Sequence, residues 1–240
     1  MSSPNCYNIV VFGEPSVGKT CFIDQFCYGR SFVIYDPDNS VFSHKIVMDG
    51  QISNLTLVDL STSFLKPENE TQHTEWAEKM LAESDGIVLL YSITSFESFE
   101  YVINQAYKYV WGSRRLKRMR NEEVGGDERE SFGCVLVGNK LDLVVAGKES
   151  RAVGRSLAEE WAQTQGVRSI EVDSLGREGP ESALKLLVKN IEKVARLERR
   201  GDEKHEGMGG QKDSIRNTLK GVFKVSNVWS GTPDPEGTQS

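Results

Sequence analysis

A chain of 240 residues, 38% hydrophobic and 27% charged, is long enough for one soluble globular domain with a segment to spare. Its formal net charge of −6 argues against general nucleic-acid binding, which needs a basic surface. No apolar run approaches the roughly 18 residues that span a bilayer, no secretory signal opens the chain, and the four cysteines lack metal-ligand spacing. We therefore expect a cytoplasmic protein with reduced thiols.

The first patterned segment predicts a phosphate-binding loop. An apolar strand pattern over residues 7–12 and a helical pattern over residues 19–28 flank a match to G-x-x-x-x-G-K-[ST]. In such a loop, backbone N–H groups point at phosphate oxygens, the lysine reaches the β- and γ-phosphates, and the threonine hydroxyl ligates Mg²⁺. A glycine-rich turn with a chance lysine is the alternative. The predicted nucleotide site is Gly13, Glu14, Pro15, Ser16, Val17, Gly18, Lys19 and Thr20, with the adjoining Cys21.

Strand and helix patterns alternate along the chain after this loop. Residues 29–40 form a polar loop with strong turn chemistry, and Asp49-Gly50 joins the next two strands as a hairpin. The second of those strands ends at Asp59, and residues 60–72 are polar and irregular. Strands are predicted over residues 41–48, 51–58, 86–91, 134–138 and 167–172, and helices over residues 73–82, 98–111, 156–165 and 181–198.

This alternation predicts an α/β fold, a mostly parallel sheet with helices on both faces. Ligands of such sheets bind at the carboxyl ends of the strands. Gly13, Asp59 and Asn139 each follow a predicted strand, so three segments distant in the sequence should meet at one edge of the sheet.

Two segments fall outside this alternation. Residues 113–132 are an insert with basic residues first and acidic residues after them, which we interpret as a solvated helix extension plus a loop; whether it is an interaction site stays open. From Arg200 the composition changes, so we divide the chain into a domain, 1–199, and a flexible tail, 200–240. Within the tail, residues 212–224 have the period of a basic amphipathic helix, which would lie on an anionic membrane or bind a partner. The alternative is a disordered tail in which this period arises by chance.

The base of the nucleotide is indicated by Asn139-Lys140-x-Asp142 at the tip of a strand. A carboxylate at Asp142 can accept hydrogen bonds from the N1–H and the 2-amino group of guanine, and adenine offers no such pair of donors. The stem of Lys140 can cover the base, and Asn139 can tie this segment to the phosphate loop. The motif therefore disfavours another class of protein with such a phosphate loop, a P-loop kinase or ATPase.

With these motifs the chain resembles the Ras-like branch of the Ras superfamily of small GTPases, over about residues 6–198. The resemblance implies a P-loop G domain with a six-stranded sheet, a monomer that toggles between GTP- and GDP-bound states, and Mg²⁺ held by Thr20 and Asp59. It also implies effector and regulator proteins that bind through residues 35–43 and 60–76. The implied partner-binding residues are Tyr35, Asp36, Pro37, Asp38, Asn39, Ser40, Val41 and Phe42.

The chain departs from the family where the γ-phosphate is sensed. Asp38 follows the proline of the first switch, where the family has threonine. In the second switch, Thr62 replaces a glycine whose N–H meets the γ-phosphate, and Ser63 replaces the glutamine that orients the attacking water. Pro15 removes an N–H from the phosphate loop. In the third guanine loop the family's Ser-Ala-Lys is Asp-Ser-Leu, so Ser174 can offer its backbone N–H and Leu175 its packing surface.

Two functions remain open. In one, the chain is a signalling GTPase with slow hydrolysis, and its catalytic candidates are Lys19 and, less strongly, Ser63. In the other, it is a degenerate GTPase that serves as a nucleotide-bound scaffold without turnover. No lipidation motif is present, because no cysteine follows Cys134 and the second residue is Ser2. Any membrane contact, for instance at the inner face of a membrane, would therefore be peripheral, through 212–224.

Overall fold

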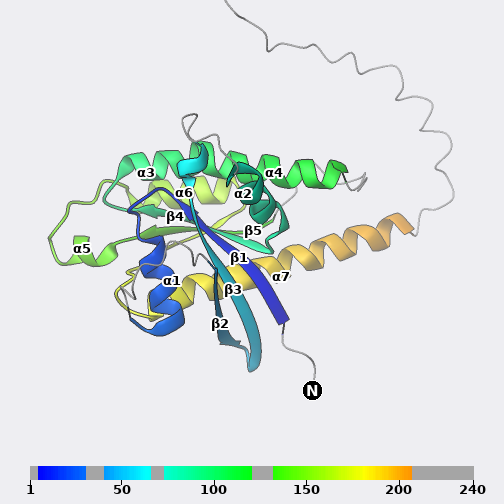
Figure 1. The fold of residues 1–240 in the computed structure, drawn as a ribbon, viewed down its shortest axis with the longest axis horizontal. Helices are drawn as coiled ribbons and strands as arrows, with labels where there is room; N and C mark the ends of the chain where they lie inside the picture. Colours follow the sequence, from blue (N-terminus) through cyan, green and yellow to red (C-terminus); the bar gives the residue numbers. More distant parts are fainter. Residues whose placement is uncertain (1–4, 31–40, 66–72, 121–131, 207–240) are drawn as a thin grey trace, which may run out of the picture. The chain divides into compact units, whose positions relative to one another are not determined.

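The computed structural model describes residues 5–30, 41–65, 73–120 and 132–206 (Figure 1). The chain divides into two units, Met1–Leu197 and Glu198–Ser240. The predicted tail residues 212–224 and the acidic half of the insert lie outside the described residues. No helix in the described ranges is both long enough and apolar enough to cross a membrane.

The sheet has six strands and is mostly parallel, as predicted, and the structure gives their order as β2-β3-β1-β4-β5-β6. Every neighbouring pair is parallel except β2 and β3, which form an antiparallel hairpin. Asp49 and Gly50 turn that hairpin with φ of 48° and 78°, which only a few residue types adopt readily. The strands are β1 (Asn5–Gly13), β2 (Val41–Met48), β3 (Gln51–Ser61), β4 (Gly86–Ser92), β5 (Gly133–Asn139) and β6 (Arg168–Glu171).

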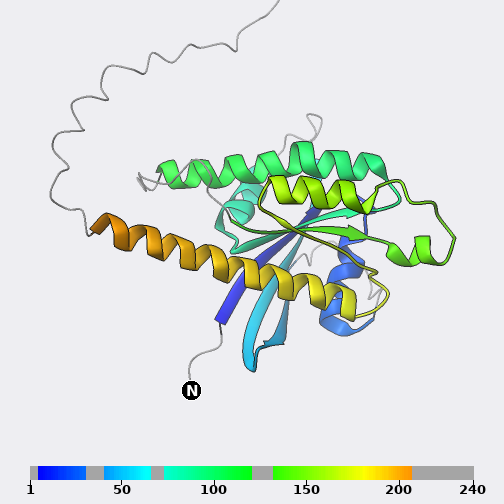
Figure 2. The ribbon, with the colours of Figure 1, turned by 180° about the vertical axis from the view of Figure 1, so that it is seen from behind.

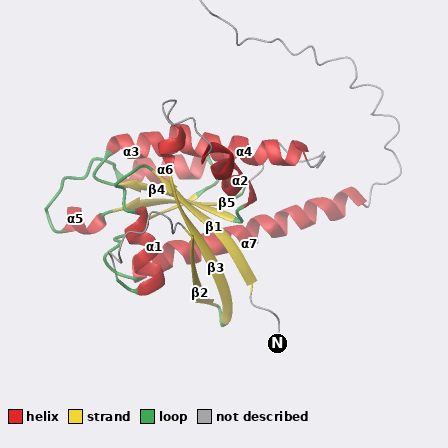
Figure 3. Cartoon of the chain, viewed as in Figure 1, coloured by secondary structure: helices red, strands yellow, loops and turns green. Residues whose placement is uncertain are grey.

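Helices cover both faces of the sheet, in red around the yellow strands of Figure 3. α1 and α7 pack on one face, and α2, α3, α4 and α6 pack on the opposite face (Figures 1 and 2). The helical segments are α1 (Lys19–Tyr28), η1 (Thr62–Leu65), α2 (His73–Glu83), α3 (Phe96–Tyr101), η3 (Val102–Ala106), α4 (Tyr107–Arg120), α5 (Leu141–Val145), α6 (Arg155–Thr164) and α7 (Glu178–Glu206).

Each face of the sheet has its own apolar core. Strand residues alternate between the two, so that Val11 packs against α1 and α7 while its neighbour Phe12 packs against α2 and η3. β4 and β5 are buried along their whole length, as parallel strands covered on both faces should be. These two cores fix the sheet, and the carboxyl ends of its strands carry the candidate site.

Several predicted boundaries are wrong by a few residues, for local reasons. The helix predicted from Ser98 begins at Phe96, because the Ser95 hydroxyl accepts a hydrogen bond from the Ser98 N–H and caps it. The same helical run continues through a π-helical turn to Arg120, into the basic half of the insert. α5 was not predicted, and β3 extends to Ser61 because it stays paired with β1. α7 continues to Glu206, past the start predicted for the tail.

Candidate functional site

The phosphate loop joins β1 to α1, and both of its glycines are required by close packing. A Cβ at Gly13 would collide with the backbone carbonyl of Leu90 on β4. Gly18 has φ 98° and lies directly before α1, where a Cβ would collide with the side-chain amide of Asn139. Between them Ser16 has φ 65°, and the side chains of Pro15 and Ser16 are exposed. The loop is therefore held tightly at its ends and open at its middle.

Lys19 is the one lysine buried among the described residues, with 7% of its surface exposed. Its ammonium donates a hydrogen bond to the backbone carbonyl of Glu14, 2.9 Å away, and so lies across the loop. Burial lowers the pKa of Lys19, and the charges of Asp59 and Glu14 offset part of that effect. A second anionic group beside this ammonium would stabilise its charged form, as a phosphate does.

Thr20 and Asp59 meet at the ends of α1 and β3. The Thr20 hydroxyl donates to Asp59 Oδ2 at 2.6 Å. Both are hard oxygen donors, which Mg²⁺ prefers, and Mg²⁺ sites on nucleotides use one or two protein oxygens completed by phosphate and water. Among the described residues, no group of three or more acidic, histidine or cysteine side chains could hold a metal ion.

Asn139 joins three segments that are far apart in the sequence. Its side-chain amide donates to the carbonyl of Val17 in the phosphate loop at 2.9 Å, and its Oδ1 accepts from the Ser174 hydroxyl at 2.8 Å. Asn139 and Ser174 are 2% and 6% exposed, so both hydrogen bonds are shielded from water. The loop after β6 and the phosphate loop are thus fixed to each other through the end of β5.

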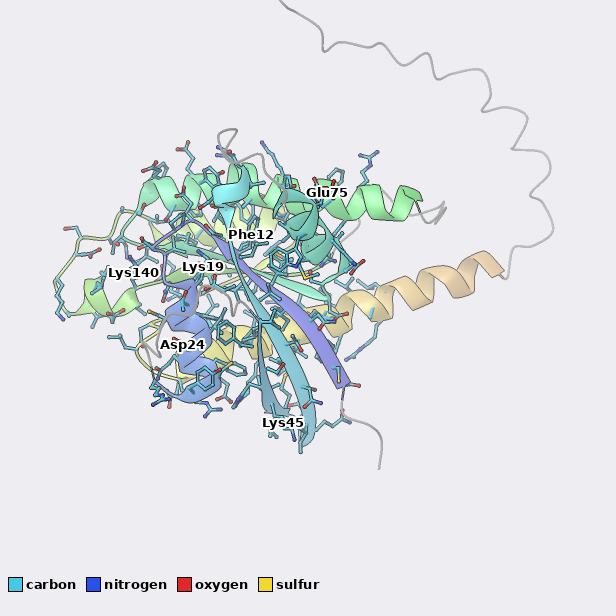
Figure 4. The ribbon with its side chains drawn as sticks, in the orientation of Figure 1. Phe12, Lys19, Asp24, Lys45, Glu75 and Lys140 are labelled. Atoms are coloured by element: carbon cyan, nitrogen blue, oxygen red, sulfur yellow. The ribbon has the colours of Figure 1, made fainter. Side chains whose placement is uncertain are left out.

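The remaining guanine-site candidates surround this bridge. Lys140 has φ 69° and precedes α5, and Figure 4 shows it at the same edge of the sheet as Lys19. Asp142 lies in the first turn of α5 and is half-buried, whereas Leu175 is 63% exposed. Sequence reasoning missed Asp173, whose Oδ1 accepts from the N–H groups of Leu175 and Gly176 and shapes the loop. The available signal was the aspartate itself, because an aspartate side chain commonly accepts a hydrogen bond from a backbone N–H two residues later and so forms a turn.

The predicted second-switch residues Thr62 and Ser63 follow β3 directly, and Ser61 is the last residue of that strand. Ser61 is in register with Gly13. The hydroxyls of Ser61 and Ser63 lie 2.7 Å apart, and the Ser63 N–H also donates to Ser61 Oγ, so these two serines hold each other. Thr62 between them has no exposed surface, and its hydroxyl has no hydrogen-bond partner within the described part of the chain.

The predicted partner-binding residues are only partly described. Tyr35, Asp36, Pro37, Asp38, Asn39 and Ser40 lie outside the described residues. Val41 begins β2 opposite Val58 and is 49% exposed, and Phe42 is half-buried against the core of α1 and α7. Cys21 is half-buried in the first turn of α1, and burial raises the pKa of its thiol.

Comparison with known proteins agrees with this arrangement. The model of the Ras family matches residues 8–193 of the chain. Protein ras-1 of Neurospora crassa is 27% identical over 188 residues, which cover 78% of this chain and 76% of that protein. Ras-like protein 2 of Mucor circinelloides f. lusitanicus is 26% identical over 156 residues, which cover 65% of this chain and 68% of that protein.

Proposed function

The chain belongs to the Ras family, and from that premise we propose that it is a guanine-nucleotide-binding switch whose own GTP hydrolysis is slow. The observation that carries the proposal is the Asn139 bridge, because it fixes the phosphate loop and both guanine-site segments in one constellation.

The phosphates of GTP or GDP would lie in the loop of residues 13–20. There the backbone N–H groups, the start of α1 and the Lys19 ammonium supply positive charge. Thr20 and Asp59 would hold Mg²⁺, which neutralises charge on the β- and γ-phosphates when bound. The lowered pKa of Lys19 supports this assignment, because burial disfavours the charged ammonium more than Asp59 and Glu14 stabilise it. A bound phosphate would add the negative charge that stabilises the ammonium.

Guanine would bind between Lys140 and the loop of Ser174 and Leu175, with Asp142 as the acceptor for its two donors. The left-handed conformation of Lys140 and the adjacent start of α5 support this, since Asp142 lies in the first turn of α5, two residues after Lys140, which Figure 4 shows at the edge that carries Lys19. Leu175 in place of lysine offers apolar contact without charge.

Slow hydrolysis follows from the second switch. Ser63 is shorter than the glutamine that orients water in this family, and its hydroxyl is 2.7 Å from that of Ser61. Thr62 adds a buried side chain where a glycine would let the backbone approach the γ-phosphate. Lys19 remains as a group that can stabilise charge in the transition state.

A second candidate function is a scaffold that keeps its nucleotide without turnover. The buried Thr62 and the Ser61–Ser63 pair favour it, since both argue against γ-phosphate sensing. In either case we propose a cytoplasmic monomer with a domain over 1–199 and a tail over 200–240, partners at 35–43 and 60–76, and at most peripheral membrane contact through 212–224.

A single-turnover assay separates the two candidates. Purified protein is loaded with GTP and Mg²⁺, and GDP formation is followed by chromatography. Measurable GDP formation that disappears in the Lys19→Ala variant would support a slow GTPase and contradict the scaffold. GTP that stays bound and intact over many hours would support the scaffold instead.

A further inference from the structure

A contact outside the nucleotide site links β2 to the start of α7. The Arg177 guanidinium lies with Nη2 2.8 Å from His44 Nε2. Arginine can only donate, so His44 Nε2 must be unprotonated and the ring's proton must be on Nδ1. On its other side the His44 ring meets Phe26 of α1 edge-on, with ring centroids 5.1 Å apart. The imidazole therefore lies between α1 and Arg177, the residue that precedes α7, and carries its proton on Nδ1.

The backbone of Arg177 is held close to the candidate guanine loop. It stands two residues after Leu175, and the intervening turn is held by Asp173 Oδ1, which accepts from Leu175 N–H at 3.2 Å and Gly176 N–H at 2.9 Å. In the first turn of α7, a Cβ at Gly179 would collide with the Asp173 carbonyl. A displacement of the Arg177 backbone is therefore difficult without moving the loop that carries Ser174 and Leu175.

His44 is tied just as firmly to the candidate partner-binding strand. It lies on β2 two residues after Phe42, and its backbone is in register with Leu55 of β3. Figures 1 and 2 both show α1 beside the first turns of α7. The His44–Arg177 contact thus joins the partner-binding strand to the guanine loop by a path that avoids the γ-phosphate.

The charges around His44 make this contact sensitive to protonation. Burial lowers the pKa of His44, and the Arg177 charge lowers it further, while Glu181 acts in the opposite direction. Glu181 is itself engaged by Arg177 at 3.8 Å and by Lys185 at 2.7 Å. A protonated His44 would place two cations in contact and remove the acceptor of Arg177 Nη2.

α1 adds one more charged group to these surroundings. Asp24 and Arg177 both act on the pKa of Cys27, which is raised to about 12, first by burial and then by Asp24.

Because the folded protein favours neutral His44, the contact between His44 and Arg177 is fully present above the ordinary histidine pKa and is lost as the pH falls.

We propose that His44 is a positioning residue for guanine-nucleotide retention, and that its contact with Arg177 couples the partner-binding strand β2 to the guanine loop and is released by protonation. The proposal rests on the proposed function, since it concerns how long that site keeps its nucleotide. A partner protein that moves β2 would act on the guanine loop through the same contact.

The test is the pH profile of nucleotide release. The full chain is loaded with a fluorescent N-methylanthraniloyl derivative of GDP, and its release into excess GDP is timed from about pH 7.5 to about pH 5.5. We expect release from the unaltered protein to become about two- to tenfold faster toward the lower pH, the scale of one lost hydrogen bond. The nucleotide's own titration is common to all variants, so only differences between profiles count.

Three variants make the result specific. His44→Gln keeps an acceptor for Arg177 but cannot be protonated, so its release should match the unaltered protein at the higher pH and lack the acceleration. Arg177→Gln should release faster at the higher pH already. His205→Gln removes another of the chain's three histidines and should keep the full slope. Equal slopes in the unaltered protein and His44→Gln would overturn the inference and leave the proposed function intact. Failure of the unaltered protein to bind the derivative would overturn both.

Discussion

Thr62 offers the most direct test of the packing in the predicted second switch, because burial of its hydroxyl without a hydrogen bond should cost stability. The residue has no exposed surface, and its hydroxyl lacks a hydrogen-bond partner among the described residues. A buried, unpaired hydroxyl costs about 1–3 kcal/mol compared with one that stays hydrated in the unfolded chain. Thr62→Val keeps the shape and removes this cost. We therefore expect the free energy of unfolding to rise by about 1–2 kcal/mol.

Thermal unfolding in saturating GDP measures this change. For a unit of this size, 1 kcal/mol corresponds to about 2–4 °C in Tm, so the Thr62→Val variant should melt about 2–8 °C higher. Thr94→Val is the matched control, because the Thr94 hydroxyl lies 2.9 Å from that of Ser92; it should lose about 0.5–1.5 kcal/mol. A Thr62→Val variant that melts at or below the unaltered protein would refute the reasoning, since it would mean that the hydroxyl is paired.

Other substitutions test the site itself. Gly18→Ala places a Cβ against the Asn139 amide at a positive φ, so GDP should dissociate at least tenfold faster, about 1.4 kcal/mol, in a fluorescence release assay. Ser174→Ala leaves Asn139 Oδ1 buried without its donor and should lower the free energy of unfolding by about 1–3 kcal/mol in denaturant titration, with Ser174→Thr as the conservative comparison. The double variant Thr62→Gly, Ser63→Gln restores the family's residues and should raise the single-turnover rate of GTP hydrolysis about tenfold or more; an unchanged rate would show that the second switch is not what limits hydrolysis.

The parts of the fold that could be predicted from sequence are those with a local physical cause. The phosphate loop was predictable because strand, glycines, lysine and helix follow one another within about twenty residues. The hairpin at Asp49-Gly50 was predictable because its turn needs positive φ at both positions. The mostly parallel sheet was predictable because strands and helices alternate along the chain, whereas the order of its strands was not predicted.

The parts that escaped prediction depend on contacts between distant residues. Ser174 was expected to offer its backbone N–H, and nothing near it in the sequence indicates that its hydroxyl bonds Asn139. The same holds for Arg177 and His44, which are 133 positions apart. The burial of Thr62 depends on where η1 packs after β3, which a polar segment in the sequence does not reveal.

The central claim, that this site holds a guanine nucleotide, is tested most directly by competition at equilibrium. Protein carrying the fluorescent GDP derivative is titrated with GDP, ADP and ATP in the presence of Mg²⁺. We expect GDP to displace the derivative with at least a hundredfold advantage over either adenine nucleotide, about 2.7 kcal/mol, because adenine offers no donor pair to Asp142. We also expect Asp142→Ala to reduce that advantage strongly. Equal displacement by ADP, or an advantage unchanged in Asp142→Ala, would contradict the assignment.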